Sequence, residues 1–449
     1  MKLIVSAWDR RENALAITCA LVRFGVCCYR AVHQAIIVDE ATTWNRFASG
    51  PWRKLFGRYD ANNHILSSVL IKASVTLGHL SPFTLRLPSL IAGLAFTLGV
   101  FWLLRRISSV PVRWAAFGLV ALHPLLMDFS IVARGYSISL AFFVWGLYYC
   151  LEKRYWIAGV LLGLAIAANL SILVPVIALV VLRRSVTLLL LVILVGGAVN
   201  YPSLRRAHRD DFYIGYSDLN TAVASFTFTS LHARPDYYGI SILGDKERTG
   251  WIGVIGLPVF LIAAAALSWR QPFYLQLFTI TLFGLILARW LFGINYPADR
   301  TCLYFVILGA LAWAVAGDCP KNPYARAVWL LPAIFVLIQF STQLQMHYFQ
   351  FWRNEADDGI IAQIIEKACE GKPGNSMSIS ASWIHQPTLE FYRQYRRIHA
   401  LKPVGRLEPP PLAGFDFYVL SGEDIDRAKQ TSLHPLFTNL DIDVILLGP

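Results

Sequence analysis

Long apolar runs alternate with short polar stretches from the start of the chain to about residue 345. Most of these runs approach the ~20 residues that an α-helix needs to cross the hydrocarbon core of a bilayer. Their lengths and spacing predict a polytopic α-helical membrane protein with about eleven transmembrane helices. We expect these helices at residues 14–38, 86–104, 112–127, 136–151, 185–201, 251–267, 273–291, 301–316 and 325–343, with two more short spans that turn near Asn169 inside 156–182.

One segment of the first loop, residues 62–79, departs from this pattern because it is amphipathic and carries His64 and Lys72. We expect this segment to lie along the membrane surface rather than to cross the bilayer. The Lys and Arg residues at the ends of the spans then fall mainly on one side, which the positive-inside rule makes cytoplasmic. The N-terminus is predicted to be cytoplasmic and the C-terminal part extracytoplasmic. If residues 62–79 crossed, every later orientation would invert.

The pattern changes from about residue 346, where apolar runs shorten and charges, Pro and Gly become frequent. Helical periodicity predicts a helix over 356–369, and a second helix is expected over 387–395. Short β-like strings at 377–382, 416–421 and 443–448 predict strands, so residues 346–449 read as a small α/β domain with a partly parallel sheet. Residues 1–345 form the membrane domain in this division. The C-terminal domain has no Gly-rich phosphate loop, and we expect it to be a cap or a partner-binding module.

Composition excludes an ordinary soluble protein, because only 15% of the residues are charged and 56% are hydrophobic, whereas a soluble protein has about a quarter charged residues. The net charge of +12 does not indicate a nucleic-acid partner, since Lys and Arg lie mainly at the ends of the apolar runs. There they serve as orientation anchors and as contacts to lipid phosphates. The seven cysteines form no disulfide framework. No His, Cys and carboxylate set has ligand spacing, so dependence on a divalent metal stays open.

Candidate chemistry begins with the acidic pair Asp39-Glu40, directly after the first span. Carboxylates are costly at a membrane boundary, so their presence points to a function. Further polar residues are predicted at the outer ends of the spans: Asp60, Asn63, His64, Arg86, Asp128, Arg134, Tyr136, Tyr296 and Arg300. A carboxylate can take the proton of an attacking hydroxyl, and an Arg can hold a phosphate by paired hydrogen bonds. Such a mixture suits group transfer from a phosphate-bearing lipid.

Structural roles stay open beside these functional ones. An Arg at the end of a span often only extends its charge to the membrane surface. For Arg86, a structural role at the start of a span and a role in phosphate binding are both open. For Asp299, a purely structural role as the salt-bridge partner of Arg300 is also open. Structural and functional roles are equally open for three of the candidates: Asp60, His64 and Asp128.

Four short strings carry a resemblance to a known family. They are YDANNHIL, LGHLSPFTLRLPSL, FSIVARGYSISL and NYPADRTCLYF, in this order after Asp39-Glu40. The chain resembles the GT-C superfamily of membrane glycosyltransferases. It is most similar to the branch of protein O-mannosyltransferase-like and aminoarabinose-transferase-like enzymes, glycosyltransferase family 39-like. The resemblance covers residues 14–343 by the order and placement of these strings.

The resemblance implies interfacial helices in the first outer loop, a sugar donor linked to polyprenyl phosphate, and an extracytoplasmic acceptor that is a lipid, a glycan or a protein. Asp39 matches the first-loop acid that acts as catalytic base or organises the acceptor. Glu40 is its neighbour and would bind a divalent metal or orient Asp39. Arg134 and Tyr136 match an Arg-Gly-Tyr string, and Arg300 matches the late Arg near the lipid phosphate. Such enzymes work among membrane lipids, here in the inner membrane of a bacterium.

One departure from the family pattern lies in the first loop. Family members often carry a Lys-Pro-Pro or similar string where this chain has Asn62-Asn63-His64, so His64 or Asn63 would take the place of a phosphate-contacting Lys. A transporter or flippase of a lipid-linked or small substrate is the alternative function. Internal repeats are typical of such proteins, and the sequence shows no convincing repeat. A structural scaffold leaves the outer polar residues unexplained.

Overall fold

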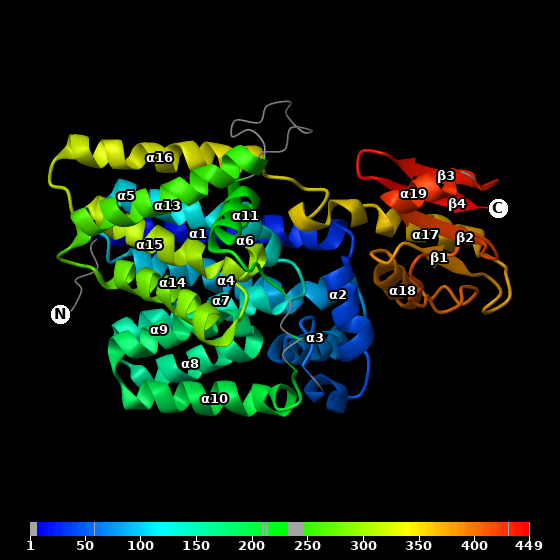
Figure 1. The fold of residues 1–449 in the computed structure, drawn as a ribbon, viewed down its shortest axis with the longest axis horizontal. Coiled ribbons are helices and arrows are strands. Elements are labelled where there is room, and N and C mark those ends of the chain that lie inside the picture. The colour runs from blue at the N-terminus through cyan, green and yellow to red at the C-terminus, as the bar shows by residue number, and fades with distance from the viewer. Residues whose placement is uncertain are drawn as a thin grey trace.

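The computed structural model describes residues 7–57, 59–208, 211, 214–231, 246–429 and 431–448. Most of the chain forms a bundle of helices that lie roughly side by side, and a small sheet domain containing the C-terminus lies beyond one end of the bundle (Figure 1). We call this the domain end of the bundle. The division at residues 345 and 346 stays a prediction.

The helices of the bundle include six that are long and apolar enough to cross a membrane. These are α1 (Ala7–His33), α4 (Pro82–Leu104), α10 (Val186–Leu204), α13 (Lys246–Ser268), α14 (Phe273–Phe292) and α16 (Pro323–Thr342). Shorter apolar helices are packed with them: α3 (Ile65–Gly78), α5 (Val110–Ala121), α7 (Gly135–Leu151), α8 (Tyr155–Ala168), α9 (Leu173–Arg183) and α15 (Tyr304–Asp318). The chain is an integral membrane protein, as its hydropathy predicted, and the number of spans stays a prediction.

The segment 112–127, predicted as one span, is broken into two helices. The helix α5 ends at Ala121, and α6 (Pro124–Phe129) begins after a break at Leu122 and His123. Pro124 occupies the first turn of α6, where a missing N–H costs nothing, but within a continuous helix its ring would clash with the preceding turn. The prediction of a single helix here was wrong because the apolar run hid the break at Pro124.

The predicted turn near Asn169 is confirmed. The helix α8 ends at Ala168, and the Asn169 side chain accepts a hydrogen bond from the Ser171 backbone N–H at the start of a short 3-10 turn, Leu170–Ile172. The helix α9 follows directly. A short polar side chain that bonds the backbone two residues later favours a turn over a continued helix.

The first loop contains three short helices before α3: α2 (Val38–Thr42), η1 (Thr43–Ala48) and η2 (Trp52–Phe56). Both α2 and α3 lie at the domain end of the bundle in Figure 1. At 14 residues, α3 is shorter than the ~20 residues of a span. It packs against α4 after a turn at His79, where φ is +62°, and its position on the membrane surface stays a prediction.

The C-terminal domain contains a four-stranded sheet with the order β1-β2-β4-β3. Its strands are β1 (Ile379–Ala381), β2 (Phe417–Ser421), β3 (His434–Asn439) and β4 (Val444–Gly448). The pair β1–β2 is parallel and the other pairs are antiparallel, so the prediction of a partly parallel sheet is confirmed. The edge strand β3 was missed because its mostly exposed side chains lack an apolar pattern.

Three helices accompany this sheet: α17 (Asp358–Ala368), α18 (Gln386–Tyr395) and α19 (Glu423–Ala428). Ile361 and Leu389 pack with Val419 and Leu446 in the core of the domain. A second cluster joins the domain to the first loop, where buried residues of both parts pack together: Ile36, Ala41, Ala48, Ile71, Leu85, Phe391 and Tyr392. The domain is therefore packed onto α2 and its neighbours.

Candidate active site

The acidic pair predicted from the sequence lies in the first turn of α2. Successive residues of a helix point about 100° apart, so Asp39 and Glu40 enter different surroundings. The Asp39 side chain keeps 12% of its surface exposed, whereas the Glu40 side chain is fully buried. The structure thus separates the two acids by their access to solvent.

Glu40 is bound to Arg86 inside the protein. The Arg86 Nε and Nη2 groups donate to the Glu40 carboxylate at 2.8 and 2.6 Å. The remaining N–H groups of Arg86 donate to the backbone carbonyls of Ala31, Gln34 and Ala35, at 2.7–2.9 Å. All five donors of the guanidinium are thereby used. Arg86 therefore fits the structural role left open for it, because none of its N–H groups is left to bind a donor phosphate.

The remaining bonds of Glu40 also go to the protein. Its Oε1 accepts from the backbone N–H of Ala133 at 2.7 Å, and its Oε2 accepts from that of Ile37 at 3.2 Å. Glu40 therefore links α2 to the segment just before Arg134. Its oxygens do not fit a metal ligand, since each already binds a guanidinium and a backbone donor. Among the described residues, no group of three His, Cys, Asp or Glu side chains is arranged to hold a metal ion.

Asp39 lies beside two arginines from distant parts of the chain. Its Oδ1 is 3.8 Å from Nη1 of Arg134, and its Oδ2 is 3.4 Å from Nη2 of Arg300. Arg134 immediately precedes α7, and Arg300 belongs to the short helix η5 (Asp299–Cys302) before α15. Two guanidinium groups that converge on one carboxylate suit an anionic ligand such as a phosphate.

Arg134 is held by the first loop. Its Nη1 donates to the Asn62 side chain at 2.6 Å, and its Nη2 donates to the Ala61 carbonyl at 3.3 Å. The next residue, Gly135, lies against the backbone of Ala168. A Cβ at this position would be only 1.9 Å from the carbonyl oxygen of Ala168. The Arg-Gly-Tyr string thus places an arginine where α7 and α8 meet the loop.

Tyr136 and His64 complete this cluster. Their rings lie 5.3 Å apart, and Tyr136 lies beside the Arg300 guanidinium. Burial, helped by the charges of Arg134 and Arg300, holds the pKa of His64 well below its ordinary value of 6.5. His64 is therefore neutral near pH 7 and does not replace the charge of a lysine. The arginines supply the positive charge of the cluster.

Three other predicted residues have structural partners. Asp60 is 3.3 Å from Arg46 and accepts from the backbone N–H of Asn62, so it shapes the loop that holds Arg134. Asn63 donates to the Leu55 carbonyl and accepts from a serine hydroxyl at the start of α3. Tyr296 forms a backbone bridge with Tyr216. None of their recorded bonds reaches Asp39.

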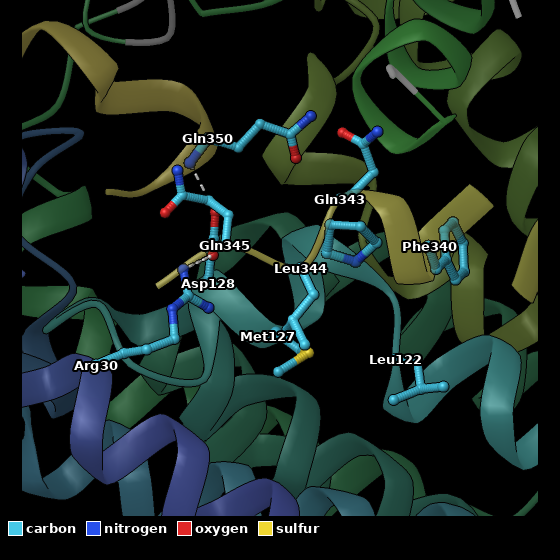
Figure 2. A pocket seen from close by; sticks show the side chains of 10 residues that line it. Arg30, Leu122, Met127, Asp128, Phe340, Gln343, Leu344, Gln345 and Gln350 are labelled. Atoms are coloured by element: carbon cyan, nitrogen blue, oxygen red, sulfur yellow. Dashed lines mark hydrogen bonds and ion pairs between the residues drawn. The ribbon is translucent and has the colours of Figure 1, made fainter. Parts of the chain in front are cut away.

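Asp128 lies in a separate polar cluster. It pairs with Arg30 of α1 at 2.6 Å and accepts from the backbone N–H of Gln350 at 2.8 Å. Figure 2 shows this pair at the edge of a small pocket that Gln343 and Gln345 also line. The pocket has a volume of about 20 Å³, which is enough for a water molecule. Asp128 joins α1, α6 and the chain after α16, and it does not line the Asp39 cluster.

Sequence reasoning missed several residues beside the cluster. Trp352 presents its ring 5.7 Å from the Arg300 guanidinium. Glu355 accepts a hydrogen bond from the backbone of Val38, the residue before Asp39. Both follow the last predicted span, where no motif marks them. Tyr59 stands in the YDANNHIL string, and burial, with nearby Tyr136 and Asp60, raises its pKa to about 12, so its hydroxyl stays protonated.

Asp299, for which a salt bridge to Arg300 was left open, binds a neighbouring helix. Its Oδ1 accepts from Ser225 at 2.7 Å and from Thr229 at 3.0 Å, both on α11 (Leu219–Leu231). These bonds tie α11 to η5, and η5 carries Arg300. Asp299 thus helps to place Arg300 by holding the backbone of η5, and its charge also acts on the Arg300 guanidinium.

A larger cavity of about 1060 Å³ lies next to the α1–α2 connection. It is bounded by the end of α1, the chain after α16, and the helices α17 and α18. Its lining includes Tyr29, Gln34, Tyr348 and Tyr392, and none of the predicted site residues. The α1–α2 connection, through Gln34 and Ala35, therefore forms one edge of this cavity.

Models of known protein families give no match to the chain, and curated protein sequences give none either. Solved structures do share its architecture. ArnT from Cupriavidus metallidurans bound to undecaprenyl phosphate aligns with a TM-score of 0.56 at 16% identity, over 97% of each chain. The apo form of that protein aligns with a TM-score of 0.55 at 14% identity, over 98% of each chain. The chain therefore has the fold seen in ArnT, which confirms the fold resemblance predicted from the sequence.

Proposed function

We propose that the protein is a membrane glycosyltransferase that moves a sugar from a polyprenyl-phosphate donor to an extracytoplasmic acceptor. The position of Asp39 between Arg134 and Arg300 is the observation that carries this proposal. The shared fold supports it, because the ArnT structure of the same architecture holds undecaprenyl phosphate. The protein would work in the inner membrane of a bacterium, with its N-terminus in the cytoplasm and the Asp39 cluster on the outer side.

In this proposal Asp39 takes the proton of the acceptor hydroxyl as the hydroxyl oxygen attacks the anomeric carbon of the sugar. The new C–O bond forms while the bond from the anomeric carbon to the phosphate oxygen breaks. The leaving group is the polyprenyl phosphate, and Arg134 and Arg300 stabilise the charge that develops on it. The site is only partly open to solvent, since Arg134 is buried and a quarter of the Arg300 side chain is exposed.

The same guanidinium groups contact Asp39 before the donor binds. An incoming phosphate would compete with the Asp39 carboxylate for their N–H groups, because phosphate accepts paired hydrogen bonds from arginine. Binding of the donor would then release the carboxylate oxygens to face the acceptor hydroxyl. The separations of 3.4 and 3.8 Å agree with partners that can exchange, since tight charged hydrogen bonds are shorter, at about 2.7–2.9 Å.

The proposal is tested with purified Asp39→Asn and radiolabelled sugars linked to polyprenyl phosphate. We expect transfer to fall by about 10²–10⁴-fold, as for loss of a general base, while the melting temperature stays near that of the wild type. Asp318→Asn is the matched control, because Asp318 is the last residue of α15, at the end away from Arg300, and accepts from the backbone of Ser108 and Ser109. Near-normal transfer by Asp39→Asn would rule out Asp39 as the base.

A further inference from the structure

We propose that Glu355 is a positioning residue through which the C-terminal part of the chain holds α2, and with it Asp39, in the geometry needed for transfer. This inference rests on the proposed function for its catalytic meaning. Its structural part, the bracing of α2, stands on contacts that are independent of the reaction. The residues involved are far apart in the sequence, so the contact exists only in the folded protein.

The central contact is a hydrogen bond at the start of α2. The first backbone N–H groups of a helix have no partner inside the helix and need one from elsewhere. The Val38 N–H donates to Oε2 of Glu355, which is fully buried in the short helix η6 (Gln350–Glu355). A side chain from the C-terminal part of the chain thus caps the helix that carries Asp39.

The protonation of Glu355 fits this role. Burial, strengthened by the carboxylates of Asp358, Asp39 and Glu40, raises the pKa of Glu355 well above its ordinary range. The buried Arg86 guanidinium uses its donors on Glu40 and backbone carbonyls. A neutral carboxyl accepts from Val38 without adding a negative charge beside Asp39. Such a charge would weaken the attraction of the cluster for a phosphate.

The helix α18 provides further support on the same side of the first loop. The Tyr392 hydroxyl accepts from the Ile36 N–H at 3.0 Å. Two side chains of η1 also reach α18, since Trp44 donates to the Gln394 side chain at 3.2 Å and Asn45 donates to a backbone carbonyl at 2.9 Å. Residues 36–45 are therefore held by hydrogen bonds to η6 and α18. Ile36 and Ala41 also pack against Phe391 and Tyr392 of α18.

These contacts give the C-terminal domain a role other than that of a cap. A shift of about 1 Å in a catalytic group can lower a rate about 100-fold, and α2 is short enough to depend on its neighbours. Loss of the Glu355 contact would leave the Val38 N–H without a partner and let α2 move relative to Arg134 and Arg300. We therefore expect the turnover number to depend on Glu355 although its side chain contacts the backbone of α2 rather than the reacting atoms.

The test uses the full chain with Glu355→Ala, Glu355→Gln and the control Asp416→Asn. Asp416 accepts from the backbone and hydroxyl of Ser378 within the C-terminal domain, away from α2. We measure kcat, KM for the donor, the melting temperature, and hydrogen exchange of residues 36–45. We expect Glu355→Ala to lower kcat about 10- to 100-fold with little change in KM, and to speed exchange in this segment. Glu355→Gln, which mimics the neutral carboxyl, should restore both, with the pH profile of the wild type.

Three results would overturn the inference. They are a folded Glu355→Ala protein with wild-type kcat and exchange, a Glu355→Gln protein as impaired as Glu355→Ala, and an Asp416→Asn protein with the same loss. If Glu355→Ala does not fold, Tyr392→Phe replaces it, since it removes the acceptor of the Ile36 N–H and is expected to speed exchange in the same segment. Exchange needs no substrate, so failure of the proposed transfer and failure of the bracing are distinguishable.

Discussion

Asp39 and Glu40 are adjacent in the sequence, and both face arginines, yet the two acid–arginine groups differ in the exposure of the acid and in the distance to its partners. Glu40 and Arg86 are fully buried and meet at 2.6 Å with all donors used. Asp39 keeps some exposure and lies 3.4 and 3.8 Å from its arginines. The first group is saturated and holds the backbone together. The second is unsaturated and has room to exchange partners, which is what binding and catalysis require.

The largest expected effect is on folding, and it concerns the buried pair. Removing one partner of a buried ion pair leaves an uncompensated charge and costs about 3–5 kcal/mol. We therefore expect Arg86→Ala and Glu40→Ala to lose most of the folded protein, as measured by thermal unfolding in detergent. A double change to Glu40→Met and Arg86→Met should be less harmful than either single change. Equal stability of Arg86→Ala and wild type would contradict the assignment of this pair as structural.

The next largest effect is on use of the lipid-linked donor, and it concerns the Asp39–Arg134–Arg300 group. Arg300→Ala removes hydrogen bonds to a charged group, each contributing about 1.5–3 kcal/mol, so kcat/KM for the donor should fall about 10- to 100-fold. Binding of polyprenyl phosphate alone should weaken in parallel, while the melting temperature changes little. Arg270→Ala is the matched control, because Arg270 is exposed and stacks on Trp269. Unchanged lipid binding by Arg300→Ala would separate Arg300 from the phosphate.

The smallest effect is a pH dependence caused by His64. Its pKa is lowered in the folded protein, so below about pH 6.5 the unfolded chain binds more protons and stability falls with falling pH. Above that value the contribution is constant. We expect the melting temperature of the wild type to drop between about pH 6.5 and 5, and this slope to be reduced in His64→Gln. An unchanged slope in the variant would show that His64 titrates equally in both states.

Much of the fold could be predicted because it depends on local properties. Apolar run length set the helices, and the turn near Asn169 followed from the basic residues at both ends of the 156–182 run. In the structure the Asn169 side chain stabilises this turn by accepting from the backbone two residues later. The break at Pro124 was missed because it lies in a run that is otherwise apolar, with His123 as its polar exception. The strand β3 was missed because an edge strand takes its backbone partners from a neighbour, here β4, and needs no apolar pattern of its own.

The candidate site was harder to predict for a geometric reason. Hydropathy places a residue at the end of a helix but does not give the direction in which its side chain points. Asp39, Arg134, Tyr136 and Arg300 meet, whereas Asp128, although predicted at the same level, faces Arg30 instead. Residues such as Glu355 carry no sequence signal, because their role depends on a backbone group more than 300 positions away.

The sequence by itself determined that this is a helical membrane protein with an acidic pair after its first span and a small α/β domain at its C-terminal end. Those properties follow from the lengths of apolar runs and from the alternation of strands and helices, which are local. Only the tertiary structure decided which of the two acids is available for chemistry. That choice depends on Arg86, Arg134 and Arg300, which come from distant segments, because burial and charge pairing are set by packing rather than by neighbours in the sequence.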